Sequence, residues 1–121
     1  MTRTLSQEGA KYNIKVNTIA PVAASRLTKD ILPPEIFERM KPEMVMPLVL
    51  YLAHENQDQT GQVYECGGGY MGKVRWQRSG GKTFKEVPQV EEVDENWEKI
   101  NSFGDDADFP DDLMAIIKKL A

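Results

Sequence analysis

Three glycines, Gly67, Gly69 and Gly72, have the G-x-G-x-x-G spacing of a dinucleotide-binding loop, and an acidic residue, Glu91, follows further along the chain. Such a loop binds a pyrophosphate only where it follows a strand and opens a helix, because the helix N-terminus supplies the amide donors. Here Gly72 leads into an alternating, strand-like run at 73–78. The sequence therefore favours a tight turn at a strand end over a phosphate site.

No pair of side chains fits the abstraction of a proton from an alcohol. A tyrosine activated by a lysine one helical turn later needs the pattern Tyr-x-x-x-Lys. The residues four places after Tyr12, Tyr51, Tyr64 and Tyr70 are valine, glutamate, glycine and valine. The single histidine, His54, lies near no recognisable nucleophile motif and cannot form a multi-histidine metal site within the chain. We therefore predict no catalytic residue and no metal ligand.

The loop from Pro21 to Thr28 is the one stretch with a candidate role in ligand binding. It leaves the carboxyl end of a predicted strand at 13–19, and ligands bind beyond the carboxyl ends of strands in open α/β sheets. Ala23 and Ala24 are small enough to let a ligand approach, and Ser25 supplies a hydroxyl. Spacing alone is equally consistent with an ordinary connection.

The elements that position this loop follow from the periodicity of the chain. Residues 13–19 are apolar and partly β-branched and stop before Pro21, which predicts a strand buried on both faces of a parallel sheet. A helical crossover leads to a second strand at 62–66, which should lie parallel to the first. The other predicted elements are a helix fragment at 2–10, crossover helices at 34–40 and 42–53, a hairpin with arms at 73–78 and 82–87, and helices at 89–101 and 110–120.

Two helices carry apolar stripes at helical spacing. In the crossover the stripe is predicted to face the core, and in the terminal helix it is predicted to be buried. The two stripes are Val45, Leu48, Val49 and Leu52, and Leu113, Ile116, Ile117 and Leu120.

The bulk composition excludes several classes of protein. The chain has 121 residues, 15 of them basic and 19 acidic, and its net charge of −4 lacks the basic footprint of a nucleic-acid-binding protein. The longest apolar run, at 44–53, contains Pro47 and is too short to span a membrane. The amino terminus has no signal-like pattern, so a soluble segment is expected. The single cysteine, Cys66, fits a reducing compartment.

Residues 17–21, Asn-Thr-Ile-Ala-Pro, resemble the sixth-strand motif of the short-chain dehydrogenases/reductases. The wider sequence is similar to one branch of that family, the (3R)-hydroxyacyl-CoA dehydrogenase unit of peroxisomal multifunctional enzymes of type 2. The stretches that carry this similarity are 13–28, 32–33, 48–50, 72–76 and 96–100. The resemblance implies the carboxyl-terminal portion of a Rossmann-type doubly wound parallel sheet at 1–78. A hairpin and helical extension, or linker, would follow at 79–121.

The resemblance also implies a cofactor and a set of binding residues. In the family the loop after this strand lies along the nicotinamide end of NAD, mainly through backbone atoms, which implicates Pro21, Val22, Ala23 and Thr28. Most members have glycine where Val22 stands. The segment 29–41 resembles the mobile substrate lid, the strand at 62–66 resembles the last strand of the sheet, and the final helix resembles the bridge towards a hydratase unit.

The family's phosphate-binding glycines and its Asn-Ser-Tyr-Lys catalytic set have no counterpart in this sequence. We therefore expect a fragment of an NAD-dependent (3R)-3-hydroxyacyl-CoA dehydrogenase of fatty acid β-oxidation, inactive alone, which supplies the nicotinamide-side loop and the lid. The resemblance implies a peroxisomal location, although Lys119-Leu120-Ala121 does not match the Ser-Lys-Leu address. The implied partners are an acyl-CoA substrate in the complete enzyme and either a second copy or the missing dehydrogenase half. A non-enzymatic oligomerisation or partner-binding module remains the alternative.

Overall fold

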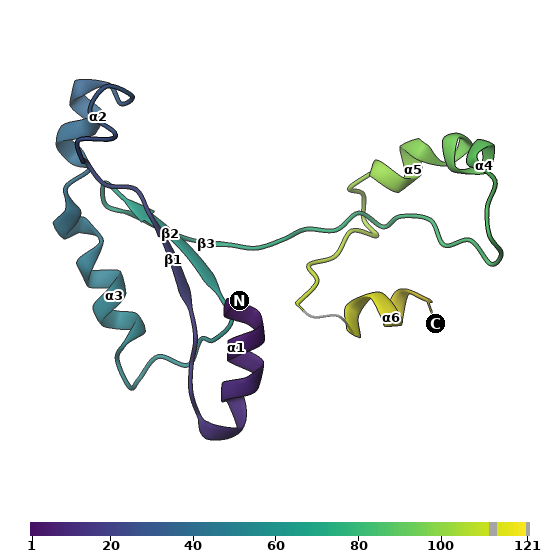
Figure 1. The fold of residues 1–121 in the computed structure, drawn as a ribbon, viewed down its shortest axis with the longest axis horizontal. Coiled ribbons are helices and arrows are strands. Elements are labelled where there is room, and N and C mark those ends of the chain that lie inside the picture. The colour runs from purple at the N-terminus through teal and green to yellow at the C-terminus, as the bar shows by residue number, and fades with distance from the viewer. Residues whose placement is uncertain (112–113, 121) are drawn as a thin grey trace. The chain divides into compact units, whose positions relative to one another are not determined.

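The computed structural model describes residues 1–111 and 114–120 (Figure 1). The chain divides into two compact units, Met1–Val74 and Arg75–Ala121. Within the described residues, no helix is both long enough and apolar enough to cross a membrane.

The first unit contains a mixed three-stranded sheet with the order β1-β2-β3. Strand β1 pairs parallel to β2, in a register that places Thr18 opposite Val63 and Pro21 opposite Cys66. Strand β3 pairs antiparallel to β2. The elements of this unit are α1 (Thr2–Gly9), a 3₁₀ turn (Ala10–Tyr12), β1 (Thr18–Pro21), α2 (Pro34–Arg39), a second 3₁₀ turn (Pro42–Met44), α3 (Met46–Leu52), β2 (Val63–Gly67) and β3 (Tyr70–Val74).

The parallel pair with its helical crossover confirms the predicted α/β class. Helices α1 and α3 lie on opposite sides of the sheet, as in a doubly wound fold (Figure 1). Strand β1 includes Pro21 as its last residue, so it ends two residues later than the predicted end at 19. Sequence reasoning therefore found the two parallel strands, the helices between them and the proline that ends the first strand.

Strand β1 begins later than predicted because side chains replace the regular ladder at 15–17. The side-chain amide of Asn17 donates to the Gln59 carbonyl at 2.8 Å and accepts from the Gln62 amide at 3.2 Å. The Val16 amide donates to the Thr60 hydroxyl at 2.9 Å. These bonds hold the incoming chain beside the loop before β2, although the backbone there does not pair as a strand.

The hairpin predicted between 73–78 and 82–87 is wrong, because the hairpin of the structure lies between β2 and β3. The antiparallel partner of β3 is β2, and the turn between them contains Gly68 and Gly69, with φ of 58° and 90°. Two consecutive positive φ angles suit the tight turns of hairpins and are readily adopted by glycine. Within the described chain, residues 82–87 form no strand, and residues 75–77 do not pair either. Local alternation alone could not identify the pairing partner.

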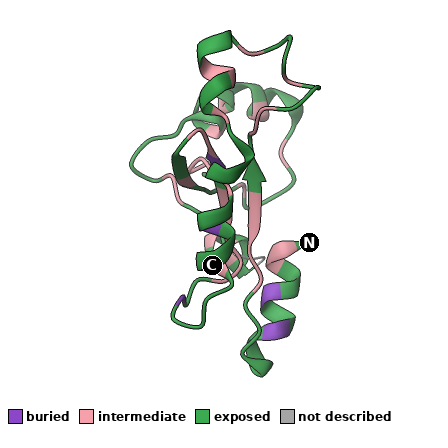
Figure 2. Cartoon of the chain, turned by 90° about the vertical axis from the view of Figure 1, so that its left-hand side faces the viewer, coloured by how far each residue is buried: buried purple, intermediate pink, exposed green. Residues whose placement is uncertain are grey.

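Few side chains are buried (Figure 2). Among the described residues, the buried apolar side chains are Leu48 and Cys66 alone. Val49, predicted to face the core, is 43% exposed, so that part of the prediction was wrong for this chain. Strand β1 has one neighbouring strand in the described sheet and is not buried on both faces as predicted. In α1 the covered residues are Ser6 and Gly9, whereas Leu5 is exposed.

In its described residues the second unit contains three short helices: α4 (Val90–Glu95), α5 (Trp97–Asn101) and α6 (Met114–Leu120). The predicted helix at 89–101 is interrupted at Asn96, whose ψ of 7° is not helical. Gln89 caps α4 by exchanging hydrogen bonds with Glu92. Leu113, predicted to belong to the last apolar stripe, lies outside the described residues, and Ile116 and Ile117 of that stripe are about half exposed.

Candidate functional site

The candidate loop begins as a continuation of the parallel ladder. The Val22 amide donates to the Cys66 carbonyl at 2.8 Å, one residue beyond the end of β1. After Val22 the chain leaves the sheet at the carboxyl ends of both parallel strands. The predicted residues Pro21, Val22 and Ala23 therefore lie together at the sheet edge where ligands bind in open α/β folds.

Thr28 closes this loop on itself. Its Oγ1 accepts a hydrogen bond from the Ser25 amide at 2.9 Å and lies 3.2 Å from the carbonyl oxygens of Ala23 and Ser25, to either of which it can donate. Hydroxyl-to-backbone bonds of this kind are typical of Ser/Thr turns. The structure thus brings Thr28 beside Ala23, and it gives the hydroxyl a role in holding the loop.

The loop offers a backbone donor to a bound group. Among the residues that the structure describes, the amide of Ala23 donates to none, whereas the amides on either side of it are both engaged. The Val22 amide is held by Cys66 and the Ala24 amide by Met40. The loop therefore presents one backbone N–H, between two engaged amides, that is available to a hydrogen-bond acceptor.

The backbone of Val22 in this loop closely approaches a glycine of the neighbouring strand, Gly67. A β-carbon at Gly67 would clash with the carbonyl oxygen of Val22 and lie 3.2 Å from the Val22 β-carbon. Most members of the family that the sequence resembles have the glycine at the position of Val22 itself. Here the side chain of Val22 is accommodated because Gly67, at the end of β2, has no side chain.

The glycine run at 67–72 binds no phosphate in the manner of a dinucleotide fingerprint. Gly68 and Gly69 form the β2–β3 turn and Gly72 lies within β3, so the run opens a strand and not a helix. Without a helix N-terminus, amide donors and dipole do not converge on an anion. The structure therefore agrees with a tight turn at a strand end and not with a helix-opening dinucleotide fingerprint.

The predicted lid segment contacts the candidate loop directly. Met40 caps the C-terminus of α2, and its carbonyl accepts the Ala24 amide. Beside this bond lies a pocket of about 240 Å³ at the carboxyl ends of β1 and β2. Its lining residues are Val22, Met40, Glu65, Cys66, Gly67 and Tyr70.

The titratable groups near the sheet form no acid–base pair. Burial raises the pKa of Tyr64, and the nearby Asp58 and Tyr51 raise it further. A tyrosine with a raised pKa is a poor proton acceptor at neutral pH. No cluster of histidine, cysteine, aspartate or glutamate in the described part of the chain could hold a metal ion.

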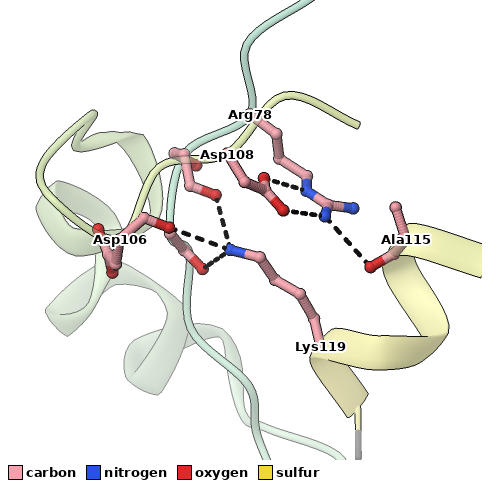
Figure 3. A network of polar contacts seen from close by, with 7 residues as sticks. Arg78, Asp106, Asp108, Ala115 and Lys119 are labelled. Atoms are coloured by element: carbon pink, nitrogen blue, oxygen red, sulfur yellow. Dashed lines mark hydrogen bonds and ion pairs between the residues drawn. The ribbon is translucent and has the colours of Figure 1, made fainter. Parts of the chain in front are cut away.

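The second unit is held by a network of polar contacts (Figure 3). Arg78 forms a two-pronged ion pair with Asp108, at 2.9 and 2.6 Å, and also donates to the Ala115 carbonyl at 3.2 Å. Lys119 donates to the Gly80 carbonyl at 3.0 Å and reaches the Asp106 carbonyl at 3.5 Å. These bonds join α6 to two segments distant in sequence, which is a structural role.

Sequence reasoning missed Met40, Tyr70 and the ion pair of Arg78 with Asp108. Two consecutive glycines after a strand were a signal for the hairpin turn that brings Tyr70 to the pocket. For Met40 and for the ion pair the sequence contains no such signal, because both contacts join residues far apart in the chain.

Comparison with known proteins gives the family relationship. No protein-family model matches the chain. It is 50% identical over 91% of its length to peroxisomal multifunctional enzyme A of Dictyostelium discoideum, covering 24% of that protein. It is 43% identical over 87% of its length to the peroxisomal hydratase-dehydrogenase-epimerase of Saccharomyces cerevisiae, covering 12% of it. A putative short-chain type dehydrogenase/reductase of Mycobacterium tuberculosis is 44% identical over 83% of the chain, which covers 35% of that protein.

A solved structure agrees with these relatives. The full-length peroxisomal multifunctional enzyme type 2 of Drosophila melanogaster superposes on 98% of the chain with a TM-score of 0.84 and 25% identity, and 22% of that protein is covered. The resemblance to this group of enzymes and to short-chain dehydrogenases/reductases is confirmed. The chain spans about a quarter of the length of the Dictyostelium relative.

Proposed function

We propose that this chain is a segment of an NAD-dependent (3R)-3-hydroxyacyl-CoA dehydrogenase of peroxisomal fatty acid β-oxidation. In that enzyme it supplies the loop beside the nicotinamide, Pro21 to Thr28, and the substrate lid at 29–41. Residues 1–78 belong to the dehydrogenase domain and residues 79–121 to an extension. The catalytic residues and the pyrophosphate site are provided by another segment.

One observation carries this proposal. The loop leaves the carboxyl end of a parallel strand, and the amide of Ala23, which has no acceptor among the described residues, lies between two anchored neighbours. Relatives of the chain support a role for this loop in a dehydrogenase, since several are peroxisomal multifunctional or hydratase-dehydrogenase enzymes. In the described sheet β1 is an edge strand, which is the position where a further strand would add.

The proposed division of roles follows from the chemistry of an alcohol oxidation. Bound NAD would supply the acceptor for a hydride from the alcohol carbon, and a tyrosine outside this chain would take the hydroxyl proton, which leaves a 3-ketoacyl-CoA. The small residues Ala23 and Ala24 allow the ring to approach the loop. The Ala23 amide would bind the carboxamide, and Thr28 would keep the loop in shape.

Reconstitution tests the proposal. The chain is mixed with the separately expressed amino-terminal part of the dehydrogenase unit of the Dictyostelium relative, and NADH formation from a (3R)-3-hydroxyacyl-CoA is followed. We expect turnover only when both pieces are present and little with the (3S) substrate. Ordinary turnover by the chain alone would overturn the claim that the catalytic residues lie elsewhere. An assembled pair that binds NAD but shows no oxidation would refute the assigned reaction.

A second candidate is a non-enzymatic module that binds a partner through its apolar surface. The observation in its favour is the number of large apolar side chains that are exposed, among them Leu50, Trp76 and Trp97, at 62%, 74% and 58%. Exposed apolar area of this kind marks interaction surfaces. Sedimentation decides: this candidate requires self-association or complex formation at micromolar concentration, and a stable monomer that takes up no partner would eliminate it.

A further inference from the structure

The β2–β3 turn is contacted by two different segments of the first unit. The backbone of Val22 lies against Gly67, at the end of β2. The sulfur of Met40 lies 3.1 Å from the point that a β-carbon of Gly68 would occupy. Nothing lies within 4 Å of the corresponding point on Gly69. Gly67 therefore contacts the candidate loop, and Gly68 contacts the residue at the end of the lid helix. No described atom lies near the β-carbon position of Gly69.

Met40 connects this turn to the candidate loop. It terminates α2, and its own amide donates to the Ile36 and Phe37 carbonyls at 3.1 and 3.2 Å. Its carbonyl accepts the amide of Ala24 at 2.5 Å. The Met40 side chain contacts Gly68, and the Met40 carbonyl holds the Ala24 amide. A movement of the lid at Met40 would therefore also move Ala24.

The amide of Ala23 lies between two fixed points. On one side the Val22 amide is held by the carbonyl of Cys66 in β2, and on the other the Ala24 amide is held by the carbonyl of Met40. A peptide group is planar, so fixing the residues on both sides restricts the direction of the amide between them. The first anchor belongs to the sheet, and the second belongs to the lid.

We propose that Met40 is a positioning residue for the cofactor, which sets the direction of the Ala23 amide through Ala24 while its side chain is seated on Gly68. This inference rests on the proposed function, because that function makes the Ala23 amide a nicotinamide ligand. Gly67 and Gly68 then form the surface against which Val22 of the loop and Met40 of the lid pack. A small turn is required at Gly67 and Gly68, since any side chain there would displace Val22 or Met40.

Amide hydrogen exchange on the full chain tests the anchoring directly. Met40→Ala removes the side chain that contacts Gly68. We expect exchange at the Ala24 amide to accelerate roughly fivefold or more, as expected for the loss of a contact of ordinary strength. The Thr18 amide, which donates to the Gln62 carbonyl at 2.9 Å, should be unaffected and reports that the sheet is intact. Met40→Leu, which conserves volume, should restore slow exchange at Ala24.

Two glycine variants separate contact from backbone strain. Gly68 and Gly69 both have positive φ, so alanine is strained at either position, but Gly68→Ala alone pushes on Met40. We expect Gly68→Ala to accelerate exchange at Ala24 and Gly69→Ala to leave it close to wild type. Equal effects of the two variants, or an Ala24 amide that does not respond to Met40→Ala, would overturn the proposal.

The reconstituted enzyme provides a second readout. Met40→Ala should raise the KM for NAD several-fold with little change in kcat, because the residue positions the cofactor loop without contacting the reacting atoms. If the exchange results hold and the reconstituted pair shows no NAD chemistry, the proposed function fails and the anchoring stands. If the pair is active and KM is unchanged in Met40→Ala, the positioning role of Met40 is wrong.

Discussion

The carbonyl oxygen of Val22 lies against Gly67, so close that no β-carbon fits at position 67. Val22 begins the candidate loop and Gly67 ends β2, and the Val22 amide bonds to the carbonyl of Cys66 beside it. The loop therefore leaves the sheet in contact with the neighbouring strand. This contact depends on the absence of one methyl group.

Gly67→Ala should displace the candidate loop. The clash is with a backbone atom, which cannot rotate away as a side chain would, and overpacking of this kind costs about 1–3 kcal/mol. We expect faster amide exchange at Val22 and, in the reconstituted enzyme, weaker NAD binding. Gly104→Ala is the matched control, because the nearest atom to its β-carbon would be 3.7 Å away. An unchanged Val22 amide in Gly67→Ala would contradict the close approach.

Thr28→Val should loosen the turn that closes the loop. Valine keeps the shape of threonine but cannot accept the Ser25 amide or donate to the carbonyl of Ala23, and the loss of hydrogen bonds costs about 1 kcal/mol each. We expect the Ser25 amide to exchange faster. Ser25→Ala tests the same turn with less effect, since the Ser25 hydroxyl makes only a 3.4 Å contact with Thr28. Equal effects of both variants would show that the Thr28 hydroxyl is not the closing group.

The sequence predicts the parallel pair well because the signals are local and strong. A β-branched run ended by Pro21, a helical crossover and a second short run leave one reasonable topology. The family resemblance also predicts a cofactor loop at Pro21 to Thr28, and in the structure this loop begins at the carboxyl end of β1.

The remaining features depend on contacts between distant residues. Alternation at 73–78 indicates a strand but not its partner, so the hairpin was assigned to 82–87 instead of β2. The apolar stripe of α3 shows that Val49 can be buried but not whether this chain covers it. The contact between Met40 and Gly68 could not be read from the sequence, since the two residues belong to different parts of the fold.

Asn17→Ala should detach the segment before β1 from the loop before β2. The variant loses a donor to the Gln59 carbonyl and an acceptor for the Gln62 amide, and we expect a local loss of about 1–2 kcal/mol. Hydrogen exchange at the Gln62 amide measures it. Asn17→Asp keeps the acceptor oxygen and should give an intermediate rate at Gln62. Identical rates in Asn17→Asp and Asn17→Ala would show that the Asn17 oxygen does not hold Gln62.

Asp108→Asn should weaken the second unit. The amide cannot accept two bonds from the Arg78 guanidinium as a carboxylate does, and the ion pair is lost. We expect faster proteolytic cleavage in the 104–108 segment. Asp105→Asn makes the same change in net charge at an exposed neighbour. It therefore distinguishes the effect of losing the ion pair from the effect of changing the net charge. Cleavage that is accelerated equally by both variants would argue against a specific role for Asp108.

The same ion pair predicts a pH dependence with a defined sign. The hydrogen bond from Arg78 lowers the pKa of Asp108 below its usual value of 3.8, with the positive charge adding to the effect. A carboxyl whose pKa is lower in the folded state contributes stability above its usual pKa and loses it as the pH falls through the folded value. The second unit should therefore lose the stability that this pair contributes as the pH falls below the usual aspartate range, and the loss should be smaller in high salt. Comparing amide exchange at Asp108, which donates to the Arg78 carbonyl at 3.0 Å, between the chain and Asp108→Asn isolates this group from other carboxyls. The variant should show the flatter profile; parallel profiles would mean that the acid sensitivity of this unit has another source.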